Sequence, residues 1–293
     1  MAAGFMKPPI LVIVGPTASG KTAFAIDLAV KHEGEIIGAD SRTVYRGMDI
    51  GTAKPTPVEQ AKVPHWGLDL VDPGEPFSVA DFKRYATAKI DEIRLRGHTP
   101  ILVGGSGLYI DAIVFDLRFG GIADKNLRRK LEDLTLDELY EYCHKYNILL
   151  PENQKNKRYI IRTIERNDTT IKRKHKPISG CIIVGIATER SVLRNRIMKR
   201  SEQILDDGVV EEARILGKKY SWESEAMTGN IYPLVRQYIE GNLSLKEVNR
   251  QLVTLDRKLA KRQMTWLRRN PYIEWCTRDE AVRYIESKLA SEY

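Results

Sequence analysis

The chain has 293 residues, which is enough for one large domain or for a domain that carries an insertion. Its apolar fraction of 42% is normal for a globular protein, and its net charge of +8 is suited to an anionic partner. The three cysteines are scattered, with no C-x-x-C pair and no histidine at metal-ligand spacing, which argues against a disulfide framework and a zinc site. We therefore expect a cytoplasmic protein, and no membrane association, because the N-terminal apolar run is too short for a signal peptide or a membrane span.

A predicted strand at Ile10–Val14 leads directly into a phosphate-binding loop. Residues 15–22 read G-P-T-A-S-G-K-T, a complete G-x-x-x-x-G-K-T motif, and a helical pattern follows at 23–29. Backbone N–H groups, the helix N-terminus and Lys21 would bind a di- or triphosphate, and the Thr22 hydroxyl is placed for a magnesium ion. The candidate phosphate ligands are Gly15, Pro16, Thr17, Ala18, Ser19, Gly20, Lys21 and Thr22.

A second predicted strand, residues 35–39, is followed by Asp40 and Ser41. Because the carboxyl ends of parallel strands form the ligand crevice of a doubly wound sheet, Asp40 should face the phosphate loop. Its position leaves three roles open: a magnesium-binding acid, a general base, or a cap for a following helix.

The next predicted element is a helix with clear start and stop signals. Ser78 and Asp81 form a capping box, and apolar residues recur at helical spacing from Val79 to Ile93. Gly97 then marks the end of this helix.

A third predicted strand, residues 101–103, ends in Gly104-Gly105-Ser106-Gly107. An ordinary ATPase would carry a magnesium-binding acid at this point of the sheet. Two glycines and a hydroxyl instead indicate close approach of a substrate and one hydrogen bond to it, which weakens the case for ATP hydrolysis.

Residues 117–176 interrupt the alternation of strands and helices. They are polar, with leucines at helical spacing and no strand-like run, and they predict an α-helical insertion domain between core segments 1–116 and 177–293. Nine Lys and Arg residues face only two acids between positions 155 and 176, a local charge of +7 that indicates a polyanionic partner.

The C-terminal part begins with a fourth predicted strand, residues 181–186, and one long predicted helix over 189–216. A further helix starts at the capping box of Ser244 and Glu247. Between positions 246 and 270 it carries eight Lys and Arg residues against two acids, and such a basic stripe can follow a phosphate backbone. Together these elements predict an α/β fold: a P-loop NTPase/kinase-like parallel sheet flanked by helices, with an α-helical insertion.

Several sequence strings closely resemble the tRNA dimethylallyltransferase family, and they extend over most of the chain. They are GPTASGKT (15–22), GADSRTVYRGMDIGTAKP (38–55), PHWGLDLVDP (64–73), FSVADF (77–82), LVGGSGLY (102–109) and LAKRQMTWLR (259–268). Members of that family transfer a dimethylallyl group from dimethylallyl diphosphate to N6 of adenosine 37 in tRNA. The resemblance implies this activity here, with the P-loop kinase fold, Mg²⁺ as cofactor and a monomeric state.

The resemblance also implies roles for individual residues. The phosphate loop would hold the isoprenoid diphosphate, Asp40 would take a proton from the adenine amine, and Ser106 would contact the substrate near the reacting centre. The target base would have to leave the anticodon-loop stack, at a cost of about a few kcal/mol. The residues expected to contact tRNA, including three from the basic C-terminal stretch, are Asp40, Ser41, Arg42, Thr43, Arg128, Arg158, Tyr159, Arg162, Arg257, Lys261 and Arg262.

One segment departs from the family pattern. Bacterial relatives usually carry an Arg before the residue matching Tyr232, where it assists the diphosphate, and an ungapped match places Thr228 there. Three explanations stay open: another cation such as Arg236 substitutes, the alignment shifts locally, or the active site is weaker.

Three other functions remain open at this point. A P-loop small-molecule or nucleoside kinase using ATP would share the loop and could use residues 155–176 as a lid, but it leaves the C-terminal basic stretch unexplained. Prenyl transfer to free AMP, ADP or ATP would not need that basic helix. A non-catalytic RNA-binding protein with a vestigial phosphate loop conflicts with the intact loop and with Asp40 and Ser106.

Overall fold

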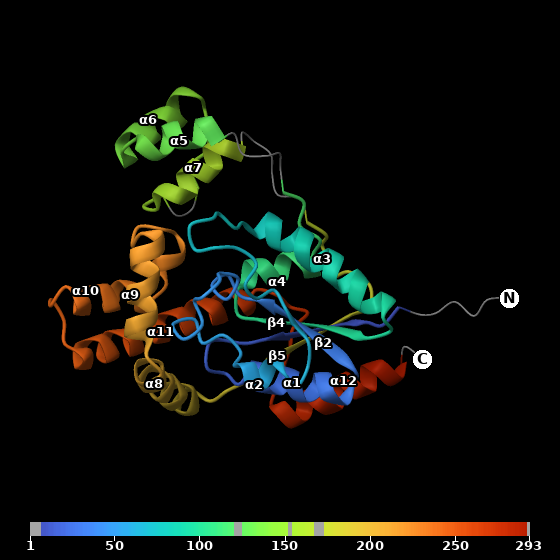
Figure 1. The fold of residues 1–293 in the computed structure, drawn as a ribbon. Helices are drawn as coiled ribbons and strands as arrows, with labels where there is room; N and C mark the ends of the chain where they lie inside the picture. The colour runs from blue at the N-terminus through green and yellow to red at the C-terminus, as the bar shows by residue number, and fades with distance from the viewer. Residues whose placement is uncertain (1–6, 120–124, 152–153, 167–172, 292–293) are drawn as a thin grey trace. The chain divides into compact units, whose positions relative to one another are not determined.

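The structure is a computed structural model that describes residues 7–119, 125–151, 154–166 and 173–291 (Figure 1). It divides into two compact units. The first is formed by Met1–Phe115 with Lys176–Tyr293, and the second by Asp116–His175. The insertion expected from the sequence, 117–176, differs from the second unit by one residue at each end.

The first unit is built on one sheet, in which six described strands run parallel in the order β3-β2-β4-β1-β5-β6. The four strands expected from apolar runs are confirmed, whereas β3 and β6 were not predicted, because each is an edge strand of only two or three residues. The strands are β1 (Ile10–Val14), β2 (Gly34–Ala39), β3 (His65–Trp66), β4 (Thr99–Gly104), β5 (Cys181–Ile186) and β6 (Glu274–Cys276).

The centre of the sheet is fully buried. All residues of β1 are buried, and Val12 pairs with Leu102 of β4 on one side and with Ile183 of β5 on the other. Because helices cover both faces of this parallel sheet, its strands are nearly continuous apolar runs. Figure 1 shows α1 and α12 on one face and α3 and α4 on the other. These helices are α1 (Lys21–Lys31), α3 (Val79–Leu95), α4 (Gly107–Val114) and α12 (Arg278–Ser291), and a short α2 (Pro57–Gln60) lies between α1 and α3 in the chain.

A group of C-terminal helices packs against the loop that follows β2. Residues Val44, Tyr45 and Met48 of this loop are buried among apolar side chains of the group. The single helix expected over 189–216 is wrong, because Gly208 adopts a φ of +97° and divides the segment into two helices. The group contains α8 (Arg190–Asp206), α9 (Val209–Tyr220), the 3₁₀ turn Ala226–Thr228, α10 (Ile231–Ile239) and α11 (Leu245–Leu267).

Both capping boxes expected from the sequence are present. The Ser78 hydroxyl accepts a hydrogen bond from Asp81 N at the start of α3, and Ser244 accepts one from Glu247 N at the start of α11. The α3 helix also ends as expected, with Gly97 at a φ of +80° just after it.

The second unit contains three helices in its described residues. They pack through a small apolar core made by Leu131, Leu139, Cys143, Ile160, Ile161 and Ile164. The helices are α5 (Lys125–Asp133), α6 (Leu136–Lys145) and α7 (Lys157–Arg166). The helical character expected of this part of the chain is therefore present.

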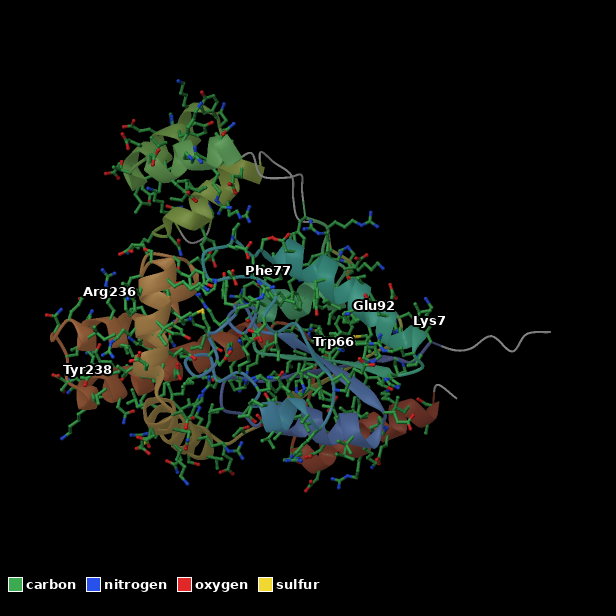
Figure 2. The ribbon with its side chains drawn as sticks, in the orientation of Figure 1. Lys7, Trp66, Phe77, Glu92, Arg236 and Tyr238 are labelled. Carbon is green, nitrogen blue, oxygen red and sulfur yellow. The ribbon has the colours of Figure 1, made fainter. Side chains whose placement is uncertain are left out.

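A buried carboxylate fixes the edge of the sheet. The Glu35 side chain on β2 accepts hydrogen bonds from Trp66 Nε1 at 2.7 Å and from Arg96 Nε at 2.9 Å, and it lies 2.7 Å from His98 Nδ1. Burial alone would raise the pKa of Glu35, but the hydrogen bonds from Arg96, Trp66 and His98 outweigh it and lower the pKa to about 2. The carboxylate thus holds Trp66 on β3 in place (Figure 2).

This network predicts an acid-sensitive contribution to stability. The folded pKa of Glu35 lies below its ordinary value of 4.5, so the carboxylate stabilises the fold above pH 4.5 and loses that effect as the pH falls toward about 2. The full effect corresponds to about 3 kcal/mol. In denaturant titrations, we expect Glu35→Gln to lower the free energy of unfolding at pH 7 and the difference from the unmodified protein to shrink below pH 4.5. A difference that stays constant with pH would show that the charge of Glu35 contributes nothing.

Candidate active site

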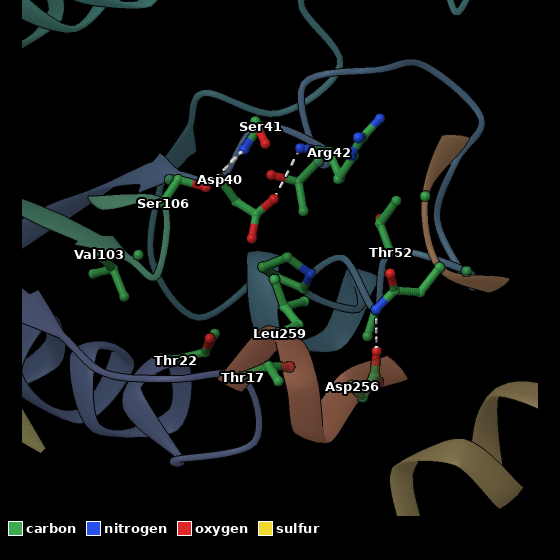
Figure 3. A pocket seen from close by; sticks show the side chains of 18 of the residues that line it. Thr17, Thr22, Asp40, Ser41, Arg42, Thr52, Val103, Ser106, Asp256 and Leu259 are labelled. Carbon is green, nitrogen blue, oxygen red and sulfur yellow. Dashed lines mark hydrogen bonds between the residues drawn. The ribbon is translucent and has the colours of Figure 1, made fainter. Parts of the chain in front are cut away.

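A cavity of about 390 Å³ opens where β1, β2 and β4 end (Figure 3). The residues that follow these three strands meet in it: the phosphate loop after β1, Asp40 after β2 and Ser106 after β4. Side chains from α8, the 3₁₀ turn, α10 and α11 complete its wall. The cavity therefore joins the phosphate loop to the two other segments that the sequence singled out.

The phosphate loop wraps tightly before α1. Gly20 has a φ of +87° and precedes the first helical residue, and Ser19 N donates to Pro16 O at 3.2 Å. Thr17, Lys21 and Thr22 line the cavity. The other predicted phosphate ligands form the turn itself and do not line the cavity: Gly15, Pro16, Ala18, Ser19 and Gly20.

Lys21 is the buried cation of the loop. Its ammonium donates a hydrogen bond to Pro16 O at 3.2 Å. Burial lowers the pKa of Lys21, the carboxylate of Asp40 raises it and the guanidinium of Arg200 lowers it, which leaves the pKa at about 8. The empty loop therefore holds its cation close to the point of deprotonation, and a bound anion would stabilise the charged form.

Two arginines of α8 reach the loop, and the sequence analysis missed both. Arg200 donates to the Thr17 hydroxyl and, at 3.3 Å, to Thr52 O, while Arg196 donates to Ser19 O at 2.9 Å. Their spacing of four residues places both on the same face of a helix, which is the signal that could have indicated a joint role. Arg200 lines the cavity and adds a positive charge beside Lys21.

Asp40 and Ser106 lie at neighbouring strand ends and both line the cavity. Asp40 Oδ1 accepts a hydrogen bond from Arg42 N at 2.8 Å, and Ser106 Oγ accepts one from Ser41 N at 3.3 Å (Figure 3). Asp40 thus closes a turn, so the helix-cap role left open by the sequence is wrong. One carboxylate oxygen has a fixed partner in this turn, and the group remains exposed to the cavity for a ligand.

The approach of β2 to β4 at this point explains one of the glycines. A Cβ on Gly104 would lie 2.1 Å from Ala39 O, well inside van der Waals contact. Gly104 is therefore required by the chain's own backbone, and the expectation that it leaves room for a substrate is wrong at this position.

The segment around Thr228 is held by Arg42. The guanidinium of Arg42 donates to Glu225 O at 2.8 Å and to the Thr228 hydroxyl at 3.3 Å. Thr228 lines the cavity, so Arg42 brings a positive charge to this wall. Arg236 does not line it; its guanidinium pairs with Glu223 at 3.0 Å and with Glu240, among the C-terminal helices (Figure 2).

The residues expected to contact tRNA fall into three sets. Asp40, Ser41, Arg42, Thr43 and Arg262 line the cavity. Arg257 and Lys261 are exposed on α11 outside it.

The third set belongs to the second unit. Arg128 and Arg162 both pair with Glu165, at 3.6 and 2.9 Å, and Tyr159 is 52% exposed on α7. Arg158 is also on α7, and its side chain lies outside the described part of the structure.

A protein-family model described as IPP transferase matches residues 43–270, and one described as Isopentenyl transferase matches residues 8–69. The chain belongs to the IPP transferase family. A tRNA dimethylallyltransferase of Geobacillus thermodenitrificans is 38% identical over 98% of this chain and 99% of its own length. One from Acetivibrio thermocellus is 40% identical over 92% of each. The solved structure of a tRNA isopentenylpyrophosphate transferase from Bacillus halodurans is 36% identical, with a TM-score of 0.74 over 97% of this chain and 96% of that one.

In this member of the IPP transferase family, the cavity offers oxygen donors for a divalent cation. The Thr22 hydroxyl and the Asp40 carboxylate both face it, and hard oxygen ligands together with substrate phosphates suit Mg²⁺. Among the described residues, no group of three or more His, Cys, Asp or Glu side chains could hold a metal by itself. The donor set thus fits a cation that is bound together with a diphosphate. None of the helices in the described part of the chain is long and apolar enough to span a membrane.

The pKa of Lys21 predicts a pH-dependent affinity for the isoprenoid diphosphate. Because the ammonium loses its charge above pH 8, we expect the affinity for dimethylallyl diphosphate in the absence of RNA to fall between pH 7.5 and pH 9.5. Calorimetric titration across this range would measure the effect. In Lys21→Met, which has no charge to lose, the affinity should be low at every pH, and an equally steep fall in that variant would assign the titration to another group.

Proposed function

We propose that this protein transfers a dimethylallyl group from dimethylallyl diphosphate to N6 of adenosine 37 in tRNA and releases diphosphate. The observation that carries the proposal is the single cavity in which the phosphate loop, Asp40 and Ser106 meet. The relatives named above support it, since two of them, 38 and 40% identical, are tRNA dimethylallyltransferases.

The cavity can hold both ends of the isoprenoid donor. Lys21, Arg200 and the N-terminus of α1 attract the diphosphate. Apolar side chains from the ends of β2, β3 and β4 form a wall that suits a short hydrocarbon chain: Ile36, Trp66, Leu68 and Val103. A purely phosphate-transferring enzyme would have no use for such a wall, so the donor site favours prenyl transfer over the kinase alternative.

The reaction needs a base on the acceptor side and stabilisation of charge on the donor side. As adenine N6 forms a bond to C1 of the dimethylallyl group, the bond between C1 and the diphosphate oxygen breaks and the bonding pair leaves with the diphosphate. Asp40 takes the proton from N6, and Lys21 and Arg200 stabilise the negative charge on the leaving group. Ser106 and Arg42 border the acceptor side and orient the base.

A magnesium ion completes this assignment. Thr22, with Asp40 nearby, would hold it together with oxygens of the diphosphate. When bound, the ion supplies further neutralisation of the leaving group.

Removing the proposed base should slow the transfer without loss of donor binding. We expect Asp40→Asn, which keeps the size of the side chain, to lower kcat by about 100-fold or more, because general-base catalysis contributes effects of this order. The assay measures label transferred from dimethylallyl diphosphate to an anticodon stem-loop. The matched control is Asp91→Asn, an exposed carboxylate on α3 outside the cavity. Full activity of Asp40→Asn would rule out the role of base.

The exposed basic face of α11 should bind RNA through its phosphates. We expect the double variant Arg257→Gln, Lys261→Gln to weaken stem-loop binding and to reduce its dependence on salt by about one unit of slope per lost contact. The control removes two exposed charges from α12, by Arg283→Gln and Lys288→Gln. Dimethylallyl diphosphate binding should stay unchanged in both, and a loss of it in the α11 variant would indicate a structural role instead.

A further inference from the structure

Gln263 connects two parts of the active site that lie far apart in the sequence. It is on α11, and its Oε1 accepts a hydrogen bond from Thr17 N in the phosphate loop at 2.8 Å. Because a carboxamide accepts through oxygen and donates through nitrogen, this bond fixes the orientation of the whole side-chain amide. One backbone amide of the phosphate loop is therefore held by a residue 246 positions further along the chain.

The nitrogen end of the same amide lies against the turn that carries Ser106. A Cβ built on Gly105 would lie 2.5 Å from Gln263 Nε2 and 3.1 Å from Gly15 O, the first residue of the phosphate loop. Position 105 thus has room only for glycine while Gln263 stays in place. The side-chain amide fills the space between the loop that would hold the diphosphate and the turn that would contact the acceptor.

The helix that carries Gln263 is well anchored. It has 23 residues, begins with a capping box and buries Leu252, Asp256, Ala260 and Leu267. Asp256 is tied in addition to Asn230 by a hydrogen bond of 2.8 Å. Gln263 therefore projects into the cavity from a fixed support and not from a loop.

We propose that Gln263 is a positioning residue, which holds the phosphate loop and the Gly105-Ser106 turn at the separation that in-line transfer requires. The inference rests on the proposed function, because the distance matters only where donor and acceptor must meet. Arg262, the preceding residue, also lines the cavity, so the same helix presents a cation to the substrates. A small misplacement of reacting groups costs up to about 100-fold in rate, which is enough for a residue that touches neither reacting atom to be essential.

Two changes on opposite sides of this contact test the inference. Gln263→Leu removes the acceptor for Thr17 N, and Gly105→Ala pushes the amide away from the other side. We expect each to lower kcat by between about 10- and 100-fold with little change in the Kd of the stem-loop. Because both act through one contact, the double variant should be no slower than the slower single variant.

A conservative variant separates positioning from packing. Gln263→Glu keeps an oxygen acceptor for Thr17 N but places a negative charge beside the diphosphate. We expect it to retain more of kcat than Gln263→Leu while raising the KM for dimethylallyl diphosphate. Thr265→Ala, an exposed change on the same helix, is the matched control and should leave both constants unchanged.

Three results would overturn the inference: an unchanged kcat in Gln263→Leu, defects of the two single variants that multiply, or equal losses in Gln263→Leu and Gln263→Glu. Titration with inorganic pyrophosphate, which needs no transfer, adds an independent reading. We expect Gln263→Leu to bind it several-fold more weakly than the unmodified protein, because the loop is no longer preorganised. An unmodified protein that binds pyrophosphate but transfers no label would count against the proposed function, whereas the comparison of variants decides the role of Gln263.

Discussion

The close approach of three parallel strand ends is the constraint on which the active site depends. At these ends β2 and β4 come so near that Gly104 has no room for a side chain beside Ala39 O. The same approach brings the phosphate loop, Asp40 and Ser106 into one cavity, although 91 positions separate the first and last of them. The buried apolar strands hold this geometry, so the stability of the sheet and the position of the chemistry have a common origin.

Positive charge is concentrated where a diphosphate would leave. Lys21 comes from the loop, Arg200 from α8 and Arg42 from the segment after β2, and each of them is held by hydrogen bonds to the protein. Fixed cations in a partly enclosed site stabilise developing charge without the cost of reorganising water. Arg42 also answers the question raised by Thr228, since its guanidinium reaches that residue while Arg236 is paired elsewhere.

Local signals in the sequence predicted most of the fold and the centre of the site. Apolar runs identified β1, β2, β4 and β5, and the loop motif identified the phosphate ligands, because these features depend on neighbours in the chain. The edge strands β3 and β6 were too short to give a pattern, and the break at Gly208 depends on one φ angle. Arg200 and Gln263 were missed as site residues because only the tertiary fold brings α8 and α11 to the phosphate loop.

The most direct test incubates the purified protein and Mg²⁺ with labelled dimethylallyl diphosphate and an anticodon stem-loop that carries adenosines at positions 36 to 38. Parallel samples offer AMP as the acceptor, or ATP without the isoprenoid. The account predicts label on the adenosine at position 37 of the RNA, none on AMP and no phosphate transfer from ATP. Label on AMP alone, or bound RNA with no transfer in any sample, would contradict it.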